Sequence, residues 1–323
     1  MIHMIKSTVC LPCLILLATA LVAVGADTNA PAGGKQPLKK ALRQKNYDKE
    51  AGPRPDLEDI SYGSHERLKL DLWEAKSDQP APILVFFHGG GGDKLMYRDN
   101  RLMAFCLSHG ISAAAVNYRP NNQAPFPVPM QDAARAIQFL RYHAADYHID
   151  PKRIATWGTS LGANVTTWLG YHDDLAKPDS QDPVELESTR LLFVVTSAGQ
   201  TFNDMHLFRE RVYPYNIPGG LDEGGETKER AKAREISAIY HVTKDDPPIF
   251  MMYGYPLQPM PLPKSTPRGQ LIHNPAFGLL FKEKLDALGI ENYFYHGGNK
   301  PPPDAEQKFI LKHFFGTSAQ LPT

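Results

Sequence analysis

Trp157-Gly158-Thr159-Ser160-Leu161-Gly162 is the stretch that decides the fold, a G-x-S-x-G hexad between an apolar run and a helical one. The run before it, 153–157 (RIATW), is typical of a short buried strand, and 162–170 (GANVTTWLG) is typical of the helix behind that strand. A serine at such a junction lies on a turn too tight for bulky neighbours, so glycine stands two residues to either side of it. The turn exposes the hydroxyl above the sheet, and the helix N-terminus favours developing negative charge beside it. Ser160 is therefore predicted to be a nucleophile.

A second motif upstream supports this prediction. The apolar segment 83–87 (ILVFF) runs directly into His88-Gly89-Gly90-Gly91-Gly92. Successive glycines leave backbone N–H groups accessible, and such groups can hold the oxyanion of a tetrahedral intermediate. Two motifs in this order, each leaving a strand, are far more specific than either motif alone.

With both motifs the chain resembles the α/β-hydrolase family, in particular its HGGG-type esterase and lipase branch, which includes the bacterial feruloyl-esterase-like proteins. The resemblance runs from about residue 60 to the C-terminus. It implies Ser160 as the nucleophile and the backbone N–H groups of Gly90, Gly91 and Leu161 as the oxyanion hole. In this family the histidine at His88 precedes the hole and packs the loop rather than joining the triad. The matching segments are 88–92 (HGGGG), 117–119 (NYR), 126–127 (FP), 158–162 (GTSLG) and 241–248 (HVTKDDPP).

The resemblance fails where the other two triad members are expected. The family places its acid in a G-x-x-D segment after the strand predicted at 248–253 (PIFMMY), but 254–282 contains no Asp or Glu. The family places its histidine a few residues beyond the last strand, where this chain has Asn299 and Lys300. Without an orienting group and a base, a serine hydroxyl is barely nucleophilic.

Two histidines are candidates for the missing base. His296 is the first, because it stands at the carboxyl end of the last predicted strand, which faces the same edge as the elbow. His273 is the second, because it precedes a predicted helix at 275–288 and faces that edge too. Among the acids, Asp204 follows a strand but favours a helix-start role, and the pair 245–246 precedes a strand and so lies at the opposite edge.

Strands alternating with helices predict a doubly wound, mainly parallel α/β sheet. The folded domain is predicted over 58–318. Within it, 200–240 is charged and interrupted by Pro214, Pro218 and a Gly-Gly pair, which favours a cap inserted over the active-site edge. Strands are expected at 60–62, 68–73, 83–87, 111–118, 153–157, 191–196, 248–253 and 292–295, and helices at 97–108, 130–145, 162–170, 275–288 and 304–315, the last capped by Asp304.

The N-terminal segment is typical of an exported protein. Lys6 precedes the apolar segment 11–24, and small residues at 24–26 fit a signal-peptidase site, so 1–26 is predicted to be a signal peptide. A periplasmic or extracellular location follows; an uncleaved membrane anchor is the alternative. Residues 27–57 read as a disordered arm. Once Cys10 and Cys13 leave with the signal, Cys106 remains alone, in an apolar context that indicates a buried small hydrophobe.

Composition narrows the function classes. Formal net charge is zero, with 35 basic and 35 acidic residues, which gives no electrostatic case for nucleic acid as a partner. The twelve histidines show no ligand spacing, so neither a metal nor another cofactor is expected, and the mature chain is expected to have no membrane span. The preferred reading is an exported serine hydrolase acting on small-molecule or polysaccharide-linked carboxylic esters, with Ser160 and His296 as catalytic residues. The alternative is an inactive relative that binds a carbonyl or carboxylate ligand.

Overall fold

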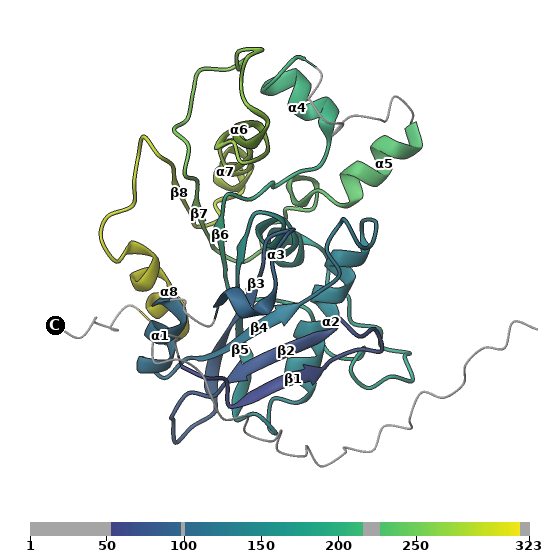
Figure 1. Ribbon diagram of the computed structural model, residues 1–323, viewed down its shortest axis with the longest axis vertical. Coiled ribbons are helices and arrows are strands. Elements are labelled where there is room, and N and C mark those ends of the chain that lie inside the picture. The colour runs from purple at the N-terminus through teal and green to yellow at the C-terminus, as the bar shows by residue number, and fades with distance from the viewer. Residues whose placement is uncertain (1–52, 98–100, 216–226, 317–323) are drawn as a thin grey trace, which may run out of the picture. The chain divides into compact units, whose positions relative to one another are not determined.

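The fold is built on a single eight-stranded sheet. The computed structural model describes residues 53–97, 101–215 and 227–316. The strand order is β1-β2-β4-β3-β5-β6-β7-β8 (Figure 1). β2 is antiparallel to its neighbours β1 and β4, and the strands from β4 to β8 are all parallel. The strands are β1 Leu57–Ser61, β2 Lys69–Trp73, β3 Ala81–Phe87, β4 Ser112–Asn117, β5 Ile149–Thr159, β6 Val194–Ser197, β7 Ile249–Met252 and β8 Asn292–Tyr295.

Helices cover both faces of the sheet, which confirms the doubly wound α/β prediction. α2 and α3 pack on one face with β3, and α1 and α8 pack on the other. The helices are η1 Lys94–Tyr97, α1 Arg101–Ser108, α2 Val128–Tyr142, α3 Leu161–Tyr171, α4 Met205–Arg211, α5 Thr227–Glu235, η2 Ala238–Tyr240, α6 Arg268–Ile272, α7 Ala276–Leu288 and α8 Ala305–Phe315.

The central strand β3 shows why the core has two layers. All seven of its residues are buried. Ile83, Val85 and Phe87 point to the layer under α2 and α3, while Leu84 and Phe86 point to the layer under α1 and α8. A strand with both faces covered needs apolar side chains at every position, which is the continuous run seen in the sequence. Cys106 is buried in the second layer as a free thiol, as predicted.

The predicted insertion at 200–240 contains α4, α5 and η2. Figure 1 shows α4 beside α6 and α7. Phe208 of α4 stacks on Phe277 of α7 with ring centroids 5.1 Å apart. Asp204 begins α4 as its N-cap and accepts hydrogen bonds from the backbone N–H groups of His206 and Leu207, which confirms the helix-start role.

Several element bounds differ from the sequence expectations by a few residues, and three local features differ in kind. The fold begins before residue 58, because Trp73 donates its indole N–H to the carbonyl of Pro53 at 2.5 Å and β1 starts at Leu57. Asp304 precedes α8 in a left-handed conformation without a side-chain cap, so its predicted capping role is wrong. The short helix α6, which begins after Pro267, was not expected.

The predicted signal peptide at 1–26, and the arm at 27–57 as far as residue 52, lie outside the described residues. Within the described ranges, every helix is too short or too polar to cross a bilayer.

Candidate active site

Ser160 lies on a strained turn between β5 and α3. Its backbone φ and ψ are 52° and −116°, a combination that non-glycine residues rarely adopt. A Cβ built on Gly162 would lie 2.1 Å from the carbonyl oxygen of Phe87, and one on Gly158 would lie 2.3 Å from the carbonyl oxygen of Gly162. Both glycines are therefore required by backbone contact. The turn presses the start of α3 against the end of β3, where the glycine-rich loop begins.

His273 is the histidine that contacts Ser160. Its Nε2 lies 2.9 Å from the Ser160 Oγ, within ordinary hydrogen-bond distance. His273 directly follows α6 and precedes α7, so the junction of these two helices places the ring over the carboxyl edge of the sheet. A serine hydroxyl donating to a neutral imidazole is the arrangement that nucleophilic catalysis requires.

The environment of His273 favours its neutral form. Burial lowers the pKa of His273, and a hydrogen bond with the Gly269 backbone opposes this by raising the pKa. Because Nε2 faces Ser160, the remaining nitrogen, Nδ1, is the one available to donate to Gly269 in α6. That bond holds the tautomer whose Nε2 lone pair can accept the Ser160 proton.

His296, the base preferred from sequence, points elsewhere. Its Nδ1 accepts from the backbone N–H of Leu257 at 3.3 Å and of Gly298 at 3.2 Å. The backbones of His296 and Asn299 pair in a tight turn after β8, which turns the ring back onto its own loop. The structure therefore moves the candidate base from His296 to the second candidate, His273.

Two of the carboxylates considered in the sequence analysis make hydrogen bonds away from His273. The buried Asp204 caps α4 and accepts from the Tyr240 hydroxyl at 2.6 Å. Asp246 accepts from the Thr243 N–H at 2.6 Å, before β7 begins. Among the described residues, the influences on the pKa of His273 are burial and the Gly269 backbone, and no carboxylate takes part.

The glycine-rich loop lies directly against the elbow. A Cβ built on Gly89 would lie 3.5 Å from the Ser160 Cβ, and one on Gly90 would lie 3.5 Å from the Cδ2 of Leu161. A Cβ on Gly91 would meet nothing within 4 Å, so this residue borders open space. The loop thus brings Gly89 beside Ser160 and Gly90 beside Leu161, while Gly91 borders the open space next to them. Backbone N–H groups at such a junction are the donors that an oxyanion hole uses.

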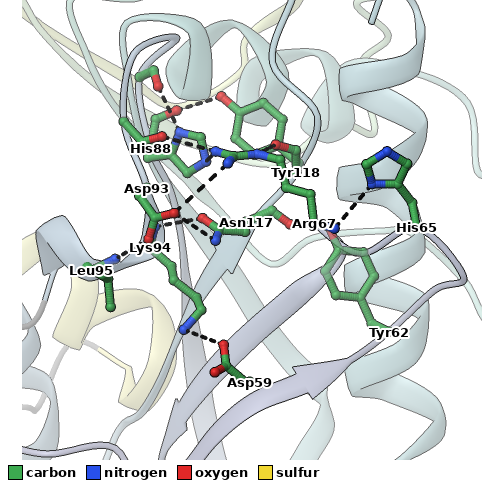
Figure 2. A network of polar contacts seen from close by, with 12 residues as sticks. Asp59, Tyr62, His65, Arg67, His88, Asp93, Lys94, Leu95, Asn117 and Tyr118 are labelled. Atoms are coloured by element: carbon green, nitrogen blue, oxygen red, sulfur yellow. Dashed lines mark hydrogen bonds and ion pairs between the residues drawn. The ribbon is translucent and has the colours of Figure 1, made fainter. Parts of the chain in front are cut away.

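Arg67 and His88 brace this loop from behind (Figure 2). Arg67 donates to the carbonyl oxygens of Tyr118 at 2.7 Å and Gly92 at 3.1 Å. Its Nη2 lies 3.3 Å from the His88 Nε2, while the His88 Nδ1 lies 2.7 Å from the Gly89 carbonyl. Since a carbonyl and a guanidinium fix both ring nitrogens, Nδ1 carries the proton and Nε2 accepts from Arg67.

Burial keeps His88 neutral. The ring is fully buried and stacks on Tyr118 with centroids 4.5 Å apart. Burial lowers the pKa of His88 to about 4, the Gly89 hydrogen bond raises it, and the Arg67 charge lowers it further. His88 is thus a packing residue of the loop, as expected, and not a base for Ser160.

Lys94 supports the same loop one layer further out, and Figure 2 shows its ion pair with Asp59. The Lys94 Nζ lies 2.5 Å from the buried Asp71 carboxylate and 3.1 Å from Asp59. The Asn117 side chain connects this ion pair to Asp93, since it accepts from the Lys94 backbone N–H and donates to the Asp93 carboxylate. Each buried charge has partners, so the segment that follows the glycines is fixed at both ends.

Comparison with known proteins gives the family and the fold. Residues 70–266 match the family model BD-FAE. The chain belongs to this family. It is therefore an α/β-hydrolase of the esterase type, with the fold predicted from its two motifs.

Two curated relatives from Mycobacterium tuberculosis illustrate the likeness. "Probable carboxylic ester hydrolase LipM" is 27% identical over 61% of this chain and 47% of its own length. Esterase LipQ is 32% identical over 61% of this chain and 48% of its own length. This BD-FAE chain thus spans about half the length of the curated relatives that it matches.

A solved structure shows the same fold. The acetyl ester-xyloside bifunctional hydrolase from Caldicellulosiruptor lactoaceticus superposes with a TM-score of 0.58 at 22% identity, over 81% of this chain and 93% of that chain.

Sequence reasoning missed two supporting residues. Gly269 was not considered because a backbone carbonyl gives no sequence signal. Arg67 was not considered because it stands apart from both motifs, in the connection between β1 and β2. The one available signal for His273 was its place immediately before a helix on the catalytic edge.

Proposed function

We propose that this BD-FAE chain is a carboxylic ester hydrolase that uses Ser160 as nucleophile and His273 as base. The observation that carries the proposal is the 2.9 Å contact between the Ser160 Oγ and the His273 Nε2. It lies on the strained elbow, beside a glycine-rich loop that a buried network braces.

In the proposed reaction, the Ser160 oxygen attacks the ester carbonyl while its proton passes to the His273 Nε2. The negative charge on the former carbonyl oxygen is received by the N–H groups of Gly90, Gly91 and Leu161. Collapse of the tetrahedral intermediate breaks the bond to the alcohol, which leaves with the proton from His273. A water then attacks the acyl-enzyme with His273 again as base, which releases the acid and restores Ser160.

In this proposal Gly269 takes the orienting part of the absent acid. A carbonyl can hold the imidazole tautomer but stabilises the imidazolium less than a carboxylate does, because it bears only a partial charge. We therefore expect a serine hydrolase slower than one with a complete Ser-His-Asp triad. Burial lowers the pKa of His273, which keeps the ring unprotonated at neutral pH but also makes it a weaker base, in line with a slow enzyme.

The substrates and the location are also proposals. Carboxylic esters, as small molecules or as acyl groups on polysaccharides, suit an oxyanion hole at a partly exposed serine. The apolar segment 11–24 and the small residues after it support export to the periplasm or beyond.

A second candidate function follows from the site, because no carboxylate among the described residues bonds to His273. It is that of a relative that holds a carbonyl or carboxylate ligand without turning it over. Hydrolysis of short-chain nitrophenyl esters by the chain and by its Ser160→Ala variant separates the two. An esterase loses its activity with the substitution, whereas equal background rates in both proteins would support the binding function.

A further inference from the structure

Three side chains gather at the far end of α3 from the catalytic serine. They are His172, Glu235 and His241, and one potential ligand atom from each lies within 4.8 Å of the others. His172 follows the last residue of α3, Glu235 ends α5, and His241 follows η2. We propose that these three residues form a site for a zinc ion.

The hydrogen bonds of the two imidazoles prepare them as ligands. The His172 Nδ1 lies 3.0 Å from the Asp173 carbonyl, and the His241 Nε2 lies 2.7 Å from the Glu235 carbonyl. A carbonyl only accepts, so each of these nitrogens carries the ring proton. The other nitrogen of each ring is then a lone-pair donor, which is how histidines that bind metals are held by their second shell.

The His172 Nε2 faces an acceptor rather than a donor. It lies 3.0 Å from Glu235 Oε1. Two lone-pair atoms at that distance repel one another unless a cation or a second proton lies between them. The spacing suits a metal, because tetrahedral ligands with bonds of about 2.0 Å lie about 3.3 Å apart.

The remaining geometry also fits. The His172 and His241 rings are 4.7 Å apart between centroids, close enough for one ion to contact both. The Glu235 side chain is 57% exposed and can adjust, while His172 is mostly buried at 14%. Glu235 and His241 also line an open cavity of about 530 Å³, so the site is accessible from solvent, although Arg230 and Arg234 line the same cavity and their charges oppose a cation. Two imidazoles and one carboxylate are a ligand set that zinc accepts, with the fourth position left to water.

This metal would be structural and not part of ester hydrolysis. Helix α3 spans Leu161–Tyr171, and at 1.5 Å per residue its ends are about 16 Å apart. The ion would tie α5 of the insertion to the helix that carries the nucleophile. The Trp168 indole already makes such a link, donating to the Glu235 carbonyl at 2.9 Å. No short ligand spacing indicates this site, since His172 and Glu235 stand 63 residues apart in the sequence.

The test is zinc binding by the full chain, measured by calorimetry with ZnCl2 and by thermal unfolding with ZnCl2 or EDTA. We expect one ion to bind with a Kd in the micromolar range or below, and saturating zinc to raise the Tm by about 5 °C. His172→Ala and His241→Ala should each weaken binding by at least about tenfold and remove the Tm shift, and Glu235→Gln provides a near-isosteric variant.

The matched control is His143→Ala. His143 also pairs with a carboxylate, the Asp146 Oδ2 at 2.8 Å, but the part of the chain that the structure describes places no third ligand there, so its removal should leave the affinity unchanged. Absence of saturable binding would overturn the proposal and leave His172 and Glu235 as a hydrogen-bonded pair without an ion. Binding that survives the combined His172→Ala and His241→Ala change would overturn it too, because the ion would then sit elsewhere, for example on the thiols of Cys10 and Cys13.

Discussion

Acid should destabilise the fold through His88, the buried histidine behind the glycine-rich loop. An unfolded histidine binds its proton near pH 6.5, whereas the folded pKa of His88 is about 4. Between these values the unfolded state binds more protons, so stability is present above pH 6.5 and is lost as the pH falls toward 4. The full difference corresponds to about 3.4 kcal/mol, of which about 2 kcal/mol is lost between pH 7 and pH 5.

Urea unfolding of the wild type and of His88→Gln at pH 7, 6 and 5 measures this contribution. Glutamine at this position removes the titration but leaves an amide to meet Arg67 and the Gly89 carbonyl. We expect the variant to be less stable at pH 7, because the stacking on Tyr118 is lost. The wild type should then lose about 2 kcal/mol more than the variant on going to pH 5, since the other titrating groups are common to both. Parallel losses in the two proteins would refute the assignment of His88 as a neutral, buried ring.

Gly162→Ala should lower the free energy of unfolding by about 3 kcal/mol and abolish most ester hydrolysis, because its Cβ would lie 2.1 Å from the Phe87 carbonyl oxygen. Urea unfolding and ester hydrolysis measure the two effects, and wild-type stability together with wild-type rates would contradict this contact. The pH profile of kcat/KM should rise to a plateau with its midpoint below 6.5, since burial lowers the pKa of His273; a midpoint above 7 would count against it as base. His296→Ala should change kcat by less than about threefold, because its ring lies against its own loop; a loss as large as that of the serine variant would restore it as a candidate. Arg67→Ala should lower kcat about tenfold with little change in KM, because it braces the oxyanion loop rather than the substrate; in steady-state assays an effect on KM alone would argue for a binding role instead.

Much of the fold could be predicted because its signals are local. The continuous apolar run at β3 requires a strand covered on both faces, and the hexad around Ser160 requires a strand-to-helix turn. The helix-start role of Asp204 was also predictable, since a capping carboxylate acts on the next few N–H groups. Asp304 shows the limit of this reasoning, because its backbone is left-handed and its side chain makes no capping hydrogen bond.

The partner of Ser160 could not be fixed from sequence. Both candidate histidines are predicted at the carboxyl edge of the sheet, and which of them contacts Ser160 depends on how α6 packs before α7. α6 has five residues, too few for a helical period to appear in the sequence. The orienting group is a backbone carbonyl, that of Gly269, and every residue carries one. The sequence therefore shows that the triad Asp is absent, but not that a backbone carbonyl bonds to the histidine instead.

The central claim is that Ser160 and His273 act together on the ester. The most direct measurement is kcat/KM for nitrophenyl acetate with the wild type, Ser160→Ala, His273→Ala and the double variant. Each single change should lower kcat/KM by at least about 10³-fold, and the double variant should be no slower than the single ones, because the two groups form one unit. Hydrolysis that persists in His273→Ala at the wild-type rate, or losses that multiply in the double variant, would contradict the pairing seen at 2.9 Å.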